Sequence, residues 1–342
     1  MTKRTRHFLF IATGILVVGL GTGLVASYMG GLQGLPLLGG GLVELEYVPA
    51  DARMLGFASV RDVMDSELRQ KLMQHLQPGG GDGADKFQEE TGVNLQTDVD
   101  AIVASMSGDS GAGDQRPLVL ARGRFDVAKL EELAVAKGAV VQEYNRRRLL
   151  THVEGNMSLA FLEDGLIGIG TPDALHRAID TKDTGANVTE NAEIMRLVKD
   201  IDDGNAWAVA RFDALTGGPN LPADLAKQLP AINWFAASGH VNGGIRGVVQ
   251  AEARDEAAAK DLRDVIRGFV ALARIQTSQQ AEFADVMNSL QLGGEGKKVS
   301  LGFAVPPEMI DAIGAMHAQR PAPELNRRPR PELPTLPATP AL

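Results

Sequence analysis

The first forty residues differ in pattern from the rest of the chain. Residues 8–43 contain no charged side chain, and Lys3, Arg4 and Arg6 precede them. As a helix rising about 1.5 Å per residue, the most apolar part (8–29) would span roughly 33 Å, enough for a hydrocarbon core of about 30 Å. We therefore predict a single-pass inner (plasma) membrane anchor within residues 1–29. Its basic segment would lie in the cytoplasm and the bulk of the chain outside, in the periplasm.

A cleaved signal peptide is the alternative interpretation of this segment. Residues 25–27 (VAS) form a small-residue cleavage site, although the apolar region of a signal peptide usually runs about 7–15 residues and this one is longer. Cleavage would make the protein secreted. Residues 30–45 are rich in glycine and leucine, and we interpret them as a flexible tether.

Short apolar runs with strand-like alternation recur between residues 46 and 318. Two sets of three runs follow the same order along the chain, and we predict strands at Met54–Val60, Ala101–Met106 and Pro117–Arg122, then at Ala206–Phe212, Trp234–His240 and Gly247–Glu252. Each set leads into an amphipathic helix, with Asp126 or Asp255 as the N-cap. The second helix carries an apolar stripe that consists of Leu262, Val265, Ile266, Phe269 and Leu272.

Later elements recur in the same order. Met157–Phe161 matches Val299–Phe303, and each half closes on a helix that begins with proline, at Pro172 and Pro307. A helix over residues 190–201, capped by Thr189, would link the two halves. Asp62 and Asp213 stand just after the first strand of each half, where they would cap a following helix.

This colinear order predicts an α+β protein with two diverged copies of one unit, at 46–185 and 186–318. Adjacent strands joined by short turns, as in 139–151 with 156–162 and 165–170, favour a mainly antiparallel sheet in each copy, with helices packed on one face. Residues 319–342 hold seven of the 17 prolines, which predicts a disordered, polyproline-like tail.

Three segments carry a resemblance to a known group of proteins. They are Tyr47–Ala52 (YVPADA), Ala58–Asp62 (ASVRD) and Thr91–Asp100 (TGVNLQTDVD). With these segments the chain resembles an uncharacterised group of bacterial membrane-anchored proteins, in which tandem extracytoplasmic α+β domains open on a Pro-Ala-Asp motif. The resemblance covers about residues 45–317. It implies a fold and a location, and it implies no activity.

Composition narrows the possible chemistry. The chain has no cysteine, which excludes disulfides, thiol catalysis and Cys-ligated metals. The net charge is −9, and because both ends are basic the acidic excess lies in the folded body. Nucleic acid is therefore not an expected partner, since phosphate binding needs a basic surface.

Sequence motifs for catalysis or metal binding are weak. Ser238-Gly-His240 would lie on a strand without the turn that presents a nucleophile, and the six histidines lie far apart. Several other segments are better explained by caps, turns and linkers than by calcium, phosphate or dinucleotide sites, and they are Asp98/Asp100, Asp202-Asp203, Gly79–Gly83 and Gly168-Ile-Gly170. We predict no catalytic, cofactor-binding or metal-binding residues.

Two further groups of residues have structural interpretations. Arg146–Arg148 is the densest positive site, and on a strand Arg146 and Arg148 would share one face of a charged sheet edge. Trp207 and Trp234 are expected in the core, and Met64 and Met73, on the first amphipathic helix, are expected in the core or in the lining of a groove.

The leading functional hypothesis is a non-enzymatic, single-pass cell-envelope protein whose outer domains bind a protein or another envelope component. The alternatives are a carrier or sensor of an apolar or lipid ligand, and a hydrolase with an unrecognised site. A binding module requires an exposed patch, a carrier an enclosed pocket, and a hydrolase a cleft with clustered titratable groups.

Overall fold

The computed structural model describes residues 43–67, 93–94, 97–108, 115–136, 138–152, 158–201, 204–212, 231–277 and 284–308. The predicted anchor, most of the tether, the proline-rich tail, Asp213 and most of the helix after Pro307 lie outside these residues. Within the described ranges, no helix combines the length and apolar character that crossing a membrane requires.

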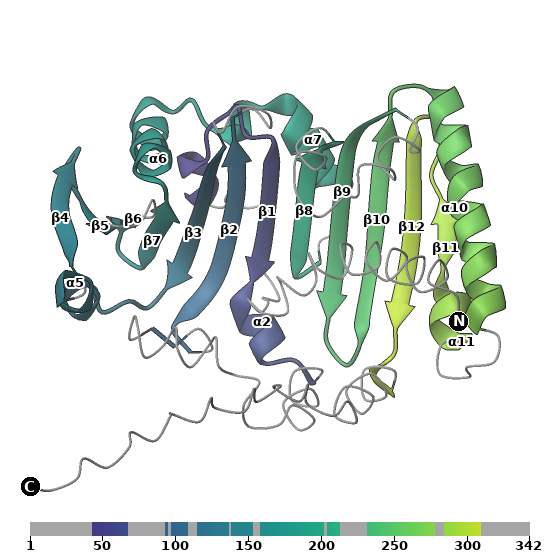
Figure 1. Ribbon diagram of the computed structural model, residues 1–342, viewed down its shortest axis with the longest axis horizontal. Helices are drawn as coiled ribbons and strands as arrows, with labels where there is room; N and C mark the ends of the chain where they lie inside the picture. Colours follow the sequence, from purple (N-terminus) through teal and green to yellow (C-terminus); the bar gives the residue numbers. More distant parts are fainter. Residues whose placement is uncertain are drawn as a thin grey trace, which may run out of the picture.

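The described strands form one large antiparallel sheet, which runs across the molecule from β4 to β11 (Figure 1). The mixed α+β character and the antiparallel pairing predicted from the sequence are confirmed. The strands are β1 (Met54–Ser59), β2 (Val99–Ser107), β3 (Arg116–Gly123), β4 (Ala139–Tyr144), β5 (Arg147–His152), β6 (Ser158–Glu163), β7 (Leu166–Gly170), β8 (Ala206–Arg211), β9 (Ile232–Val241), β10 (Ile245–Ala253), β11 (Gln291–Gly293) and β12 (Lys298–Val305).

The strand order repeats about the centre of this 12-stranded sheet. Outward from β1 the order is β2-β3-β7-β6, and outward from β8 it is β9-β10-β12-β11; β5 and β4 extend the first side only. We predicted one sheet for each half. The structure has a single sheet instead, because β1 and β8, the first strands of the halves, pair with each other. Since β12 takes the place beside β10 that β7 takes beside β3, our match of Met157–Phe161 with Val299–Phe303 was wrong.

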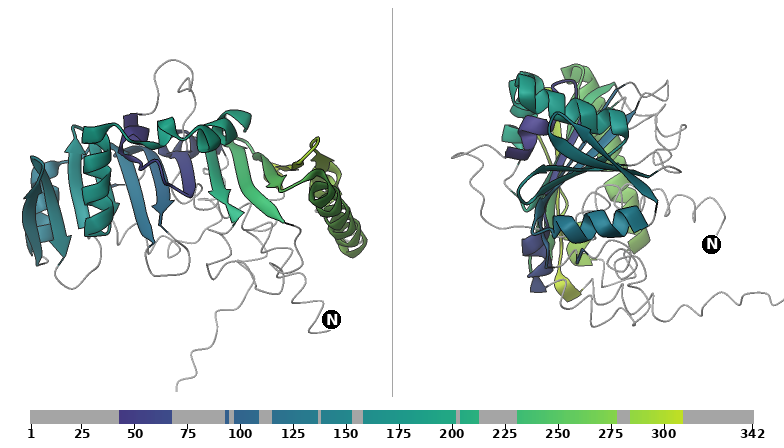
Figure 2. Two further views of the ribbon diagram at one scale, coloured as in Figure 1. Left: turned by 90° about the horizontal axis from the view of Figure 1, so that it is seen from above. Right: turned by 90° about the vertical axis from the view of Figure 1, so that its left-hand side faces the viewer.

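Helices cover both faces of the sheet, in contrast to the single covered face that we predicted. We call the side with Phe57 and Trp207 the first face, and the side with Ala58 and Phe235 the second face. The first face packs against η1 (Val43–Tyr47), α6 (Pro172–Thr184) and α7 (Ala192–Asp200). The second face packs against α2 (Val60–Met64), α5 (Val127–Ala136) and α10 (Glu256–Thr277). In the right-hand view of Figure 2, which looks onto the β4 end, α5 and α6 lie on opposite sides of the strands.

Two of the predicted helix caps are confirmed and two are wrong. Asp126 accepts a hydrogen bond from the backbone N–H of Lys129 at 3.0 Å, and Asp255 accepts one from that of Ala258 at 2.8 Å. Thr189 lies instead in the 3₁₀ turn η2 (Val188–Glu190), and α7 is capped by Asn191, whose side chain accepts from the N–H of Ile194. β1 runs directly into α2, which leaves Asp62 inside that helix.

The Pro-Ala-Asp segment has a structural role at the start of the fold. Asp51 pairs with Arg177 of α6 at 3.0 Å, and the carbonyl of Ala50 accepts a hydrogen bond from the side chain of Asn191 at 2.7 Å. Tyr47 just before it is buried, and its hydroxyl donates to Glu163 of β6 at 2.9 Å. These contacts fix the chain on the first face where it enters the body.

Candidate interaction surface

The two ends of the sheet differ in how open their edge strands are (Figure 1). β11 has three residues, and α10 and α11 (Ala284–Ser289) pack at that end. β4 has six residues, and the four from Val140 to Glu143 are exposed. An edge strand of this kind presents unpaired N–H and C=O groups to other chains, and proteins usually shorten, cover or charge such edges.

Three exposed valines gather at the β4 end. Val140 is 48% exposed on the first face and Val141 is 41% exposed on the second. Val135, on the adjacent helix α5, is 48% exposed. We call these valines, together with the outer edge of β4, the β4 surface. Val135 and Val141 share the second face, and neighbouring exposed apolar side chains beside a sheet edge are a feature of contact sites.

β4 and β5 form a tight hairpin in place of the continuous strand 139–151 that we predicted. Asn145 and Arg146 connect them with φ of 46° and 63°, the signature of a two-residue type I′ turn. Arg146 is therefore a turn residue, and the prediction that it shares a strand face with Arg148 was wrong. The turn sets Tyr144 opposite Arg147 and so fixes the register of the whole hairpin.

That register determines which backbone groups of β4 point outward. In a hairpin with a two-residue loop, the closing pair, here Tyr144 and Arg147, is hydrogen-bonded, and the pattern alternates from there. Gln142 and Val140 therefore bond to β5. The N–H and C=O groups of Ala139, Val141 and Glu143 point away from the sheet, along the edge.

On the first face, the side chain of Tyr144 anchors the end of β4 to helix α6. The hydroxyl of Tyr144 donates to Asp180 of α6 at 2.9 Å, and the ring stacks on His176 with a centroid distance of 4.0 Å. The hydrogen bond to Asp180 raises the pKa of Tyr144 above its ordinary value.

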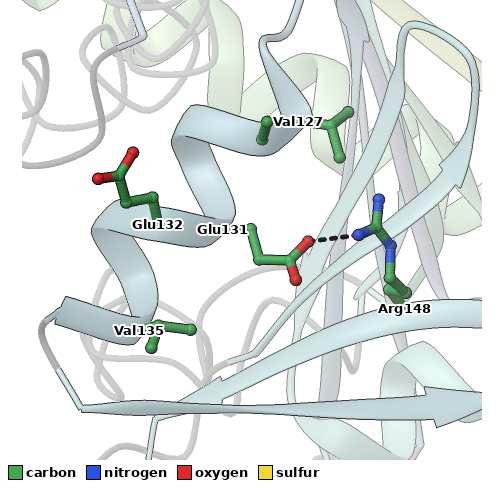
Figure 3. A pocket seen from close by; sticks show the side chains of 6 residues that line it. Val127, Glu131, Glu132, Val135 and Arg148 are labelled. Atoms are coloured by element: carbon green, nitrogen blue, oxygen red, sulfur yellow. Dashed lines mark hydrogen bonds and ion pairs between the residues drawn. The ribbon is translucent and has the colours of Figure 1, made fainter.

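On the second face, a groove of about 590 Å³ runs between α5 and the hairpin (Figure 3). Its apolar wall consists of Val127, Ala128 and Val135. Glu131 points across it to Arg148 of β5, with an ion pair at 2.5 Å, while Glu132 points away (Figure 3). The groove is open, and its charged lining consists of the Glu131–Arg148 ion pair and Glu132, which suits a side chain from a bound polypeptide better than an enclosed ligand.

A second exposed apolar site lies at the opposite end of the sheet. On α10, Leu272 is 47% exposed and Ile275 is 70% exposed, whereas Leu262 is buried. We predicted Leu272 as part of the core stripe, which was wrong: the helix continues past the small cluster that covers its first turns.

The weak catalytic pair on β9 is not assembled. The hydroxyl of Ser238 is buried on the first face and makes no hydrogen bond, so it is not activated by His240. Trp207 and Trp234 are buried near it, as predicted; Trp207 stacks on Phe57 across β1 and β8, with ring centroids 5.9 Å apart.

The carboxylates considered for metal binding have other partners. Asp98 accepts hydrogen bonds from the backbone N–H of Asn94 and from the hydroxyl of Thr97, both at 2.8 Å, and Asp100 pairs with Arg61. No group of three or more potential ligands is found among the residues that the structure describes. Asp202-Asp203, Gly79–Gly83 and Met73 lie outside them.

Gly168 and Gly170 lie in β7, where the lack of a side chain permits close packing. A Cβ at Gly168 would stand 3.0 Å from Leu175 of α6, and one at Gly170 would stand 2.7 Å from the carbonyl of Pro117. The helix that follows is capped by Thr171, which accepts a hydrogen bond from Ala174.

Comparison with known proteins gives two kinds of weak likeness. No family model matches the chain. The "DNA integrity scanning protein DisA" of Beutenbergia cavernae is 25% identical over 193 residues, which are 56% of this chain and 47% of that protein. The chain thus spans less than half the length of this curated relative, and the likeness shows no family for it.

Two crystal structures of TP0453 resemble the fold at low similarity. Crystal form I has a TM-score of 0.48 with 8% identity, covering 80% of this chain and 97% of that chain. Crystal form III has a TM-score of 0.45 with 8% identity, covering 79% and 97%.

Sequence reasoning missed the β4 surface. The available signal was the adjacent pair Val140-Val141. Successive residues of a strand point to opposite faces, so two valines in succession place an apolar side chain on each face. This pattern differs from the apolar–polar alternation of a strand with one solvated face.

Proposed function

We propose that the chain is a non-enzymatic, single-pass protein of the cell envelope, whose body binds another protein through the β4 surface. The observation that carries this proposal is the open β4 edge with Val135, Val140 and Val141 exposed around it. Strand addition at such an edge draws affinity from main-chain hydrogen bonds and specificity from side-chain pockets, for which the α5 groove is suitably placed.

A photocrosslinking experiment tests this proposal. A photoreactive amino acid replaces Val141 in the full chain, which is expressed in its native membrane and irradiated. We expect a discrete covalent adduct with a protein, identified by mass spectrometry. The control carries the same group at Asp261, an exposed position on α10, and should yield none. Equal background at both positions would contradict a binding role for the β4 surface.

The proposed location rests on the uncharged segment 8–29 and the basic residues before it. Because the chain has no cysteine, a single Leu272→Cys substitution gives one exposed thiol on the body. A membrane-impermeant maleimide should label it in intact spheroplasts. Labelling only after lysis would place the body in the cytoplasm and contradict the proposal.

We also propose that residues 46–185 and 186–318 are diverged copies of one unit. The shared strand order on the two sides of the β1–β8 pair supports this interpretation, as does the placement of α5 and α10 after the third strand of each half.

A carrier of an apolar ligand is the second candidate function. On the second face, rows of small residues cross β1, β8 and β9: Gly56, Ala208 and Ala237 form one row, and all three are half-buried. A row of small side chains of this kind is compatible with an acyl chain lying across the sheet. Native mass spectrometry of the full chain in detergent would show a retained lipid if this function is correct, and only the mass of the protein if it is not.

A further inference from the structure

We infer that the polypeptide bound at the β4 surface is a second copy of this chain, paired β4 to β4 in antiparallel fashion about a two-fold axis at Val141. This inference rests on the proposed function, since it names the partner of the same surface. It would join two sheets into one across their open edges.

The first argument is geometric. Ala139, Val141 and Glu143 direct their N–H and C=O groups outward, as the hairpin register requires. In an antiparallel pair centred on Val141, this residue exchanges both backbone hydrogen bonds with its copy, and Ala139 does so with Glu143 of the second copy. Every outward group of the strand then has a partner.

The second argument is the match of side chains in that register. Val141 packs against Val141 of the second copy on the second face, and Val140 lies opposite Gln142 on the first face. A two-fold axis at Gln142 would place Val141 opposite the charged Glu143, and an axis at Glu143 would place two carboxylates opposite each other, which is destabilising. An axis at Val140 would pair only the first part of the strand.

The third argument comes from the neighbouring helix. Val135 of α5 is exposed beside β4, on the face where the two Val141 side chains would meet. The two-fold axis brings the Val135 side chains of both copies toward the same strip, so that valines exposed in one chain become mutually covered. An interface with two-fold symmetry needs such a self-complementary patch.

The fold already contains a pairing of this kind. β1 and β8, the first strands of the two halves, pair antiparallel at the centre of the sheet, with Phe57 opposite Trp207. Antiparallel pairing between a strand of the first half and a strand of the second therefore already joins the two halves of this sheet. By contrast, the three-residue β11 offers too short an edge for the same pairing.

The test uses the full chain in a mild detergent, with its mass measured by sedimentation equilibrium. We expect a dimer for the wild type and a monomer for Val141→Pro, because the proline removes an N–H that points outward and spares the hydrogen bonds to β5. Val141→Lys, which places two cations on the axis, should also be monomeric. Leu272→Lys, at the opposite end of the sheet, should remain dimeric. Circular dichroism confirms that each variant is folded.

Cysteine crosslinking tests the register. Hydrogen-bonded antiparallel partners have Cα atoms about 5.5 Å apart, within the range of a disulfide. Under mild oxidation, Val141→Cys should form a covalent dimer, and Val140→Cys, which lies opposite Gln142 of the second copy, should not. A monomeric wild type, or equal crosslinking at both positions, would overturn the inference. If the wild type is monomeric while the photocrosslinker at position 141 captures a different protein, the proposed function stands and the second copy is excluded as the partner.

Discussion

At the scale of single residues, Asp62 is a carboxyl group that the fold accommodates poorly. Its Oδ2 atom is buried without a hydrogen-bond partner. Burial, with a smaller contribution from Asp65, raises the pKa of Asp62 to about 6. A carboxyl whose pKa is higher in the folded state than in the unfolded state favours folding while it is protonated. The stability that protonated Asp62 contributes is fully present below about pH 4 and is lost as the pH rises through 6.

Asp62→Asn should therefore stabilise the protein at neutral pH. We expect a gain of about 1–2 kcal/mol at pH 7, reduced from the full value of the pKa shift because solvent screens part of the side chain, and almost none at pH 4. Urea unfolding of the full chain in detergent at both pH values measures it. The exposed Asp261→Asn serves as the control and should change neither value. A gain of equal size at pH 4 would show that the effect is not one of ionisation.

The hydrogen bond between Tyr47 and Glu163 should give the free energy of unfolding the opposite dependence on pH. Burial acts to raise the pKa of Glu163, but the hydroxyl of Tyr47 and the ammonium of Lys182 together hold it below its ordinary value. The stability contributed by this pair is therefore present above about pH 4.3 and is lost as the pH falls. Tyr47→Phe should cost about 1–2 kcal/mol at pH 7 and less at pH 3. In the same unfolding experiment, Tyr144→Phe should cost less, because Tyr144 is only half-buried whereas Tyr47 is fully buried.

Residues whose role depends on their immediate neighbours were predictable. Asp126 and Asp255 cap the helices that directly follow them, since the capping bond spans only three residues. Asp62 looked equivalent and is not, because the helix begins one turn earlier, at a point set by packing of Val60 and Val63. The partner of Tyr47 lies 116 residues away, and no local pattern indicates it.

At the scale of elements, the β4–β5 hairpin contains a strained turn that can be improved. Arg146 has a φ of 63°, a conformation that costs a residue with a Cβ roughly 1–2 kcal/mol. Arg146→Gly should stabilise the hairpin by about 1 kcal/mol, as it creates the Asn-Gly pair that type I′ turns prefer. Gly138→Ala is the matched control. Gly138 has a φ of 89° with open space around it, so backbone strain alone should destabilise this variant by about 1 kcal/mol. Urea unfolding that gave both variants the same sign would contradict this account.

Element type was easier to predict from the sequence than element ends. The alternation of apolar residues located β1, β2, β3, β8, β9 and β10 to within two residues. It did not reveal the break at Asn145-Arg146, because this pair lacks the glycine that usually marks such a turn. Periodicity also wrongly included Leu272, which is exposed, in the core stripe of α10. Periodicity shows the direction in which a helical side chain points, and it does not show how far the sheet extends beneath the helix.

At the scale of the whole molecule, the decisive contact is the β1–β8 pair. The order of strands within each half could be read from the sequence, whereas the union of the halves could not. Both strands have an alternating pattern that would suit a separate edge as well as a central position. The largest core cluster extends across this pair, from Leu175 and Ile179 of α6 to Trp207 and Trp234. The body should therefore unfold as one cooperative unit despite its repeated strand order.

Trp207→Ala tests this cooperativity. Trp207 is 3% exposed and stacks on Phe57 across the pair, so its truncation should cost about 3–5 kcal/mol. If the body is one unit, hydrogen exchange of the full chain in detergent will show the same loss of protection for amides in β3, on the side of the first half, and in β10, on the side of the second. Leu272→Ala, on the exposed flank of α10, should change neither. A loss confined to β8, β9 and β10 would mean that the halves unfold separately. The shared sheet would then be an interface between two domains rather than the core of one.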